Sequence, residues 1–268
     1  MKECYVHGYS DREAERLSDQ AATLAHLLHF DTSYQGGRLV LEAGCGTGSQ
    51  SRILAASSPH AVIISLDISR SSLLRAGAEL KSLNAANIRL LQADVFRLPF
   101  DDETFDDIFL CFLLEHLKEP DVALAELYRV LKKGGTITVI EGDHGSCYFY
   151  PETPEALRVW RCLIDVQASI GCNSLIGRQL YPLIKAAGFT GIYVSPRMVY
   201  SDETHPEMME GFVRRTIIPM VEGVRDQAIS AGMVNRESWD RGIAGLYRTA
   251  EPPSGTFCYT FFKARAIK

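Results

Sequence analysis

The stretch Arg38-Leu39-Val40-Leu41-Glu42-Ala43-Gly44-Cys45-Gly46-Thr47-Gly48-Ser49 decides the fold of this chain. An apolar run suited to a buried strand leads into three glycines spaced two apart, and residues 50–56 can form a helix. Glycine suits a turn that opens a helix, because the turn needs unusual backbone angles and a side chain would keep a ligand away from the backbone. The stretch predicts a strand, a turn and a helix beside a nucleotide-like ligand. A tight strand-to-helix corner without a ligand is the alternative.

The spacing of the glycines narrows the choice of ligand. The dinucleotide fingerprint G-x-G-x-x-G would require glycine where the chain has Ser49, and the Gly-Lys-Ser/Thr ending of a phosphate loop is absent. The pattern E-x-G-x-G-x-G resembles motif I of the class I S-adenosylmethionine (SAM)-dependent methyltransferases. This resemblance implies that Gly44, Gly46 and Gly48 pass beside the methionine part of SAM, and that Glu42 helps to position its ammonium end.

The composition excludes several classes of protein. The 268 residues allow one large α/β domain with insertions, and 46% hydrophobic with 23% charged residues is ordinary for a globular chain. A net charge of −5 disfavours nucleic acid as a partner, since that binding needs clustered Lys and Arg. Seven scattered cysteines without a C-x-x-C pair favour reduced thiols. We expect a cytoplasmic monomer or homodimer with no membrane association.

A second predicted strand, residues 61–66, ends at Asp67 and is followed by a predicted helix over residues 70–83. Both NAD and SAM enzymes place a carboxylate at this distance from the glycine loop to accept both ribose hydroxyls. Ile68 is expected to form a wall for the adenine ring. A role for Asp67 as the cap of the following helix is the alternative, and it is compatible with ribose binding.

A third strand, predicted over residues 88–95, supports SAM rather than NAD. With Leu98-Pro99-Phe100 it resembles the Q-x-D-x-x-x-L-P-F signature of the methyltransferases. The resemblance implies that Asp94 accepts a hydrogen bond from the adenine amino group and that the N–H of Val95 meets the ring. Carboxylates at three successive strand ends indicate the C-terminal edge of a parallel sheet, where open α/β sheets bind ligands.

The same resemblance implies that the end of the fourth predicted strand, residues 104–112, lies beside the reacting methyl group. Cys111 is therefore assigned to the cofactor site. The Asx-Pro-Pro-aromatic motif of many enzymes that methylate nucleic-acid bases is missing. His116 follows this strand, where a catalytic base and a cap of a buried turn are both reasonable roles for a histidine.

The fifth predicted strand, residues 136–141, precedes a polar and aromatic segment over residues 142–151. We expect this segment to be a loop at the ligand edge, where the acceptor chemistry is built. Asp143 and His144 are not expected to bind a metal, because adjacent side chains face different ways and no third ligand stands at a useful spacing.

The remaining chain predicts one domain with two helical insertions. The resemblance implies a three-layer α-β-α sandwich around a seven-stranded, mostly parallel sheet of order 3-2-1-4-5-7-6. The expected core covers about residues 10–145, 176–200 and 255–268, and the expected helical lids cover about residues 146–175 and 201–254. At the N-terminus, residues 11–29 predict an amphipathic helix preceded by Tyr9, which either fixes the helix to the core or closes over the ligand.

The expected function is transfer of a methyl group from SAM to an O, N, S or C atom of a small-molecule acceptor, which leaves S-adenosylhomocysteine. A protein methyltransferase and a SAM-binding protein without transfer activity are the alternatives. The candidates for proton transfer are His144, His116 and Tyr9, in that order. The candidates for acceptor binding are Tyr148, Tyr150 and Arg178, and no metal is expected.

Overall fold

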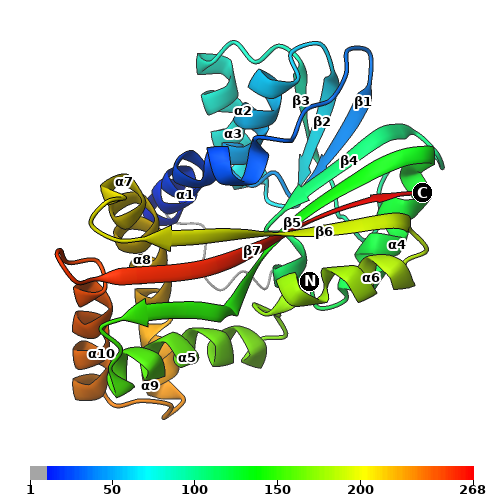
Figure 1. Ribbon diagram of the computed structural model, residues 1–268. Helices are drawn as coiled ribbons and strands as arrows, with labels where there is room; N and C mark the ends of the chain where they lie inside the picture. Colours follow the sequence, from blue (N-terminus) through cyan, green and yellow to red (C-terminus); the bar gives the residue numbers. More distant parts are fainter. Residues whose placement is uncertain (1–10) are drawn as a thin grey trace.

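A seven-stranded sheet of order β3-β2-β1-β4-β5-β7-β6 forms the centre of the computed structural model, which describes residues 11–268 (Figure 1). The strands β1 to β5 are parallel, and β7 lies antiparallel between β5 and β6. This order confirms the predicted fold class. The strands are β1 (Leu39–Ala43), β2 (Val62–Asp67), β3 (Ile88–Gln92), β4 (Phe105–Cys111), β5 (Leu131–Tyr150), β6 (Thr190–Ser201) and β7 (Thr256–Ile267).

The central strands are apolar on both sides because both faces of the sheet are covered. In β1, Val40 belongs to one hydrophobic cluster and the next residue, Leu41, to the other. The same alternation places Phe109 and Leu110 of β4 on opposite faces. Successive strand residues point to opposite faces, so the continuous apolar runs of the sequence form two cores.

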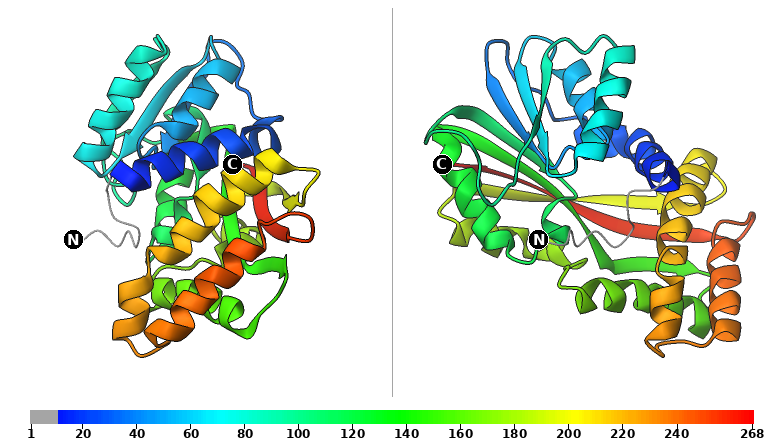
Figure 2. Two further views of the ribbon diagram at one scale, coloured as in Figure 1. Left: turned by 90° about the vertical axis from the view of Figure 1, so that its left-hand side faces the viewer. Right: turned by 180° about the vertical axis from the view of Figure 1, so that it is seen from behind.

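Helices cover both faces of the sheet (Figures 1 and 2). The residues of α1 and α2 join one core, and those of α4 and α6 join the other. The helices are α1 (Asp11–His29), α2 (Ser49–Ser57), α3 (Arg70–Ser82), η1 (Leu114–His116), α4 (Pro120–Val130), α5 (Pro154–Ser169), η2 (Ile176–Gln179), α6 (Leu180–Ala186), α7 (Pro206–Met208), η3 (Met209–Ile217), α8 (Ile218–Glu222), α9 (Arg225–Ser230) and α10 (Arg236–Arg248).

The strands β5, β7 and β6 extend well past the other four and form a second, three-stranded arm (Figure 1). The prediction of a loop over residues 142–151 is therefore wrong. After an irregularity between Asp143 and Tyr148, β5 resumes its pairing with β7, so that Phe149 lies opposite Phe257. The alternation of exposed and buried aromatic residues stabilises this arm, because one face buries its rings against α5 and η3.

The helices after β6 cross from the arm to the N-terminal helix. The segment η3, a π-helix, packs along α1, while α8 and α10 contact α5 (Figure 2). Within residues 11–268, no helix combines the length and the hydropathy that crossing a bilayer requires. The consequence for the site is that α1 and η3 stand over the C-terminal ends of the central strands.

Candidate functional site

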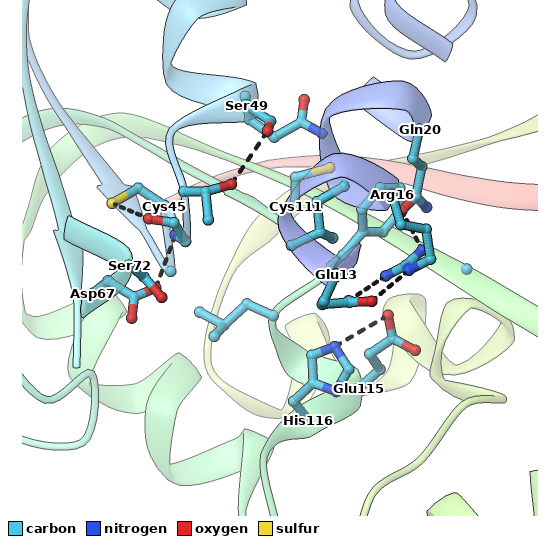
Figure 3. Close-up of a pocket in the computed structure, with 18 of the residues that line it drawn as sticks. Glu13, Arg16, Gln20, Cys45, Ser49, Asp67, Ser72, Cys111, Glu115 and His116 are labelled. Atoms are coloured by element: carbon cyan, nitrogen blue, oxygen red, sulfur yellow. Dashed lines mark hydrogen bonds and ion pairs between the residues drawn. The ribbon is translucent and has the colours of Figure 1, made fainter. Parts of the chain in front are cut away.

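A cavity of about 490 Å³ lies at the C-terminal edge of the sheet. One end is formed by the glycine loop and by the ends of β2 and β3. The other end is formed by α1, η1, η3 and the long strands β5 and β7. Figure 3 shows Cys45 and Asp67 at the first end, Cys111 between the two ends, and Glu13, Arg16 and Glu115 at the second. We call them the cofactor end and the acceptor end.

The glycine loop has the backbone shape that its sequence requires. Gly44, Gly46 and Gly48 all have positive φ angles, of 73°, 53° and 87°. Gly44 and Gly46 line the cavity, whereas Gly48 does not. Within residues 11–268 and apart from its chain neighbours, a Cβ atom at Gly46 would meet no atom within 4 Å, so the backbone there borders open space that a ligand can fill. Gly48 instead precedes α2 as its N-cap and lies against Ala76.

The contrast between Gly46 and Gly48 yields a testable prediction. Gly46→Ala is expected to lower SAM affinity about tenfold or more, since its methyl group enters the cavity, while backbone strain costs only about 1–2 kcal/mol of stability. Gly48→Ala is expected to cost more stability, because a Cβ there would stand 3.0 Å from the Cβ of Ala76. Urea unfolding and calorimetry with SAM separate the two effects. A larger loss of affinity for Gly48→Ala would contradict this assignment.

Asp67 fixes the glycine loop and faces the same cavity. Its Oδ2 accepts a hydrogen bond from the Gly46 N–H at 2.8 Å, and its Oδ1 accepts one from the Ser69 N–H at 2.8 Å. Each carboxylate oxygen has a second lone pair, so these bonds leave acceptor capacity for ribose hydroxyls. Ser69, not Asp67, is the N-cap of α3, with its side chain accepting from the Ser72 N–H. The alternative role of Asp67 as the helix cap is therefore wrong.

The other predicted cofactor residues divide between the cavity and the core. Ile68, Asp94 and Cys111 line the cavity. The Oδ1 of Asp94 accepts a bond from the Phe96 N–H at 3.0 Å, which holds the turn after β3. The side chain of Val95 is buried in the core, so the prediction for this residue concerns its backbone alone.

Glu42 does not line the cavity, and its predicted contact with the cofactor is not supported. The side chain is buried behind the loop, where its Oε2 accepts bonds from the hydroxyls of Ser51 at 2.6 Å and Ser65 at 2.5 Å. The physical reason is that the side chain of Glu42 points into the layer between β1 and α2. Burial raises the pKa of Glu42 to about 7, with a smaller contribution from Asp67.

The raised pKa of Glu42 makes stability depend on pH. Below about pH 4.5 the residue is protonated in both states, and stability is full; between 4.5 and about 7 only the unfolded chain releases the proton. The folded state is therefore expected to lose up to about 3 kcal/mol as pH rises through this window. Glu42→Gln should remove this loss. Urea unfolding of the wild-type protein and of Glu42→Gln at low and high pH measures this loss. If the two proteins differ in stability by the same amount at both pH values, Glu42 is not the cause of the pH dependence.

The acceptor end is formed by side chains from distant parts of the chain. His144 of β5 is buried, and its Nδ1 lies 2.7 Å from the hydroxyl of Tyr259 on β7. Trp160 of α5 donates its indole N–H to the backbone oxygen of His144 at 2.8 Å, which fixes the position of the residue. The Nε2 of His144 has no hydrogen-bond partner within residues 11–268. Both His144 and His116 line the cavity.

Both histidines are neutral at pH 7. Burial lowers the pKa of His144 to about 4, and Glu115 only partly offsets the effect. Burial likewise lowers the pKa of His116 to about 4, with a further contribution from Arg16. A neutral imidazole has one nitrogen able to accept a proton, which is the form that a general base requires.

Several cavity residues have no counterpart among the sequence-based assignments. Glu13, Arg16 and Gln20 form a polar stripe on α1, and Glu115 lies beside His116 (Figure 3). The 3- and 4-residue spacing of the stripe is a helical signal that the sequence contains. The aromatic and apolar part of the wall gives no local signal, because its members come from separate elements: Phe112, Phe212, Ile217, Met220, Tyr259 and Phe261.

The three residues predicted to bind the acceptor lie outside the cavity lining. Tyr148 and Tyr150 are 68% and 60% exposed, because β5 continues as a strand and turns these side chains to its outer face. Arg178 forms a bidentate pair with Asp143, with N–O distances of 2.6 and 2.8 Å. Tyr9 lies outside the described residues. Among those described, no group of three His, Cys, Asp or Glu residues is arranged to hold a metal ion.

Comparisons with known proteins agree with this geometry. A family model described as a methyltransferase domain matches residues 41–139. An uncharacterised 37.1 kDa protein of a Streptomyces fradiae transposon is 32% identical over 73% of this chain and 54% of its own length. The demethylmenaquinone methyltransferase of Staphylococcus carnosus is 39% identical over 39% of this chain and 43% of its own length. The chain thus spans about half the length of these relatives.

Solved structures show the same fold at low identity. A methyltransferase-like protein from Bacillus halodurans superimposes with a TM-score of 0.57 at 18% identity, over 92% of this chain and 99% of the other. Phosphoethanolamine N-methyltransferase 2 of Haemonchus contortus, in complex with SAM, has a TM-score of 0.56 at 18% identity, over 92% and 52%. Residues 41–139 thus match a methyltransferase domain, and the sheet order of the whole chain is that of the class I SAM-dependent methyltransferase fold.

Proposed function

We propose that this protein transfers the methyl group of SAM to a small-molecule acceptor. The observation that carries the proposal is the single continuous cavity, which joins the glycine loop and Asp67 to a chamber walled by His144, Tyr259 and η3. A volume of about 490 Å³ lies in the range of small-molecule sites. Such a cavity brings two small molecules together, which is the geometry that group transfer needs.

The cofactor end fits SAM in shape and in chemistry. The bare backbone at Gly46 leaves room for the methionine part, Asp67 offers acceptors for the ribose hydroxyls, and Asp94 with Phe96 lines the expected adenine position. When bound, SAM supplies a methyl group on a sulfonium, which an acceptor atom attacks directly. The protein itself aligns the reactants and excludes water, and such alignment lowers the barrier by about 7–11 kcal/mol in good model systems.

The acceptor end can take a proton. When the Nδ1–H of His144 donates to the Tyr259 hydroxyl, Nε2 retains its lone pair for a proton from the acceptor. His116 is the second neutral imidazole of the cavity. We assign proton acceptance to His144 first, because the hydrogen bonds of Tyr259 and Trp160 hold it in one place.

The cover of the cavity favours a small molecule over a protein side chain. The helices α1 and η3 pack against each other, and both contribute residues to the wall, among them Leu17 and Phe212. A protein acceptor would need an open groove at this position. We infer that η3 and α8, from the second helical insertion, act as the lid that was predicted for that segment.

Two measurements test the proposal. Calorimetry should detect SAM binding, and a screen of small-molecule acceptors with methyl-labelled SAM should detect transfer to at least one compound class. SAM binding without transfer to any acceptor would indicate a binding protein, and transfer to proteins alone would indicate a protein methyltransferase. Absence of SAM binding would overturn the proposal.

A further inference from the structure

The acceptor end contains more carboxylates than cations. Arg16 is already neutralised by Glu13, with N–O distances of 2.7 and 2.8 Å, and it also donates to Gln20 (Figure 3). Glu115 lines the same end, and Glu141 lies behind it at the end of the parallel part of β5. Lys118 at the rim is exposed and lies beside Gly171. Among the described residues, the carboxyl groups around Glu115 therefore outnumber the cations.

Within residues 11–268, the carboxylate of Glu115 forms no ion pair with a lysine or an arginine. Its ion-pair partner within residues 11–268 is His116 Nε2 at 3.6 Å, and this histidine is neutral at pH 7. Burial raises the pKa of Glu115, which the nearby His144 and Arg16 only partly oppose. Burial and the proximity of Glu115 raise the pKa of Glu141. A positive charge placed beside Glu115 would lower the pKa of both carboxyl groups and stabilise their charged forms.

Aromatic rings line the same cavity as Glu115. Phe112, Phe212 and Phe261 line the cavity, with centroid distances of 5.4 Å between Phe112 and Phe261 and 5.8 Å between Phe212 and Phe261. The faces of aromatic rings attract ammonium groups, more strongly when water is excluded. A buried carboxylate and a cluster of rings in one cavity are the combination that suits an organic ammonium ion.

We propose that the methyl acceptor is an amine, and that it binds as an ammonium ion between the carboxylate of Glu115 and the rings of Phe112, Phe212 and Phe261. The inference rests on the proposed methyl transfer and names the substrate class for the same site. The charge of Glu115 is what distinguishes an amine from an alcohol, a phenol or a carbon acceptor of the same shape.

The proposed transfer needs no proton acceptor other than groups that line the cavity. The ammonium first loses one proton to Nε2 of His144, which leaves a nitrogen lone pair. This lone pair forms the new N–C bond to the methyl carbon, and the C–S bond breaks with its electron pair remaining on sulfur. The imidazolium then releases its proton when the product leaves. Glu115 positions the nitrogen and stabilises the positive charge on both histidine and amine.

A matched pair of probes tests the charge preference without turnover. Benzylamine, protonated at neutral pH, and benzyl alcohol have nearly the same shape. Calorimetry with the protein saturated with S-adenosylhomocysteine should show benzylamine binding about tenfold more tightly, which corresponds to about 1.4 kcal/mol. Glu115→Gln should abolish the preference while retaining affinity for S-adenosylhomocysteine. Glu237→Gln, an exposed change on α10, should leave the preference intact.

The outcomes separate this inference from the proposed function. Equal binding of the two probes, tighter binding of the alcohol, or no binding of either at millimolar concentration would overturn the amine assignment, as would a preference that survives Glu115→Gln. The comparison in the wild-type protein alone suffices if the variant does not fold. Failure to bind S-adenosylhomocysteine would instead contradict the proposed methyl transfer.

Discussion

His144→Ala is expected to lower the rate of methyl transfer by about a hundredfold to ten-thousandfold, which is the usual contribution of a positioned general base. SAM affinity should change little, because His144 stands at the acceptor end, whereas the predicted SAM contacts are at the other. Single-turnover transfer of labelled methyl to the best acceptor from the screen, together with calorimetry for SAM, measures the two quantities. Equal losses in rate and in SAM affinity would contradict a role on the acceptor side.

Tyr259→Phe is the matched control for this variant. It keeps the ring and removes only the hydroxyl that lies 2.7 Å from Nδ1 of His144. Since His144 remains in place but its tautomer is no longer fixed, we expect a smaller loss of rate, about tenfold. A rate loss as large as that of His144→Ala would mean that Tyr259, rather than His144, takes part directly in proton transfer.

Asp67→Ala is expected to weaken SAM binding by about a hundredfold or more. The change removes a carboxylate from the ribose position, where hydrogen bonds to a charged group contribute about 1.5–3 kcal/mol each. It also releases the Gly46 N–H, which the carboxylate holds at 2.8 Å. The loop would then lose the anchor that shapes the cavity at its cofactor end. Calorimetric titration with SAM measures the effect.

Asp94→Ala provides the comparison. Among the described residues, its carboxylate holds the Phe96 N–H in the turn after β3, and the predicted ligand contact is one amino group of adenine. We therefore expect a loss of affinity of about tenfold. Unchanged affinity in Asp67→Ala would exclude the ribose assignment. NAD should not compete with SAM in either variant. Competition at comparable concentration would support a dinucleotide site at the glycine loop instead.

Most residues of the cofactor end could be predicted from local sequence patterns. Gly44, Gly46, Asp67 and Asp94 were all expected at one edge of the sheet, and all line one cavity. Each residue ends or follows a parallel strand, and the carboxyl ends of such strands meet at the same edge. The exceptions are Glu42 in β1, Gly48 in the glycine loop and Val95 after β3, none of which lines the cavity. Which side of a turn a side chain occupies depends on the helix packed behind it.

The residues of the acceptor end could not be predicted from local sequence patterns. Tyr148 and Tyr150 follow the strand closest to the chemistry, yet the continued pairing of β5 with β7 turns both outward. The expectation of a loop assumed that β5 stops where the parallel sheet stops. The strand that pairs with the extended part of β5 is β7, which comes more than a hundred residues later. No local pattern in β5 predicts that pairing.

The sequence by itself predicted the cofactor end, because that end depends on contiguous strand-turn-helix units whose residues are neighbours in the chain. The order of the sheet was predicted only through the resemblance to the methyltransferases. Only the tertiary structure decided the acceptor end. There His144 meets Tyr259 across 115 residues, and α1 packs on η3. Side chains from such distant segments are brought together by burial of the helices against the long strands, and this packing is not encoded in any single motif.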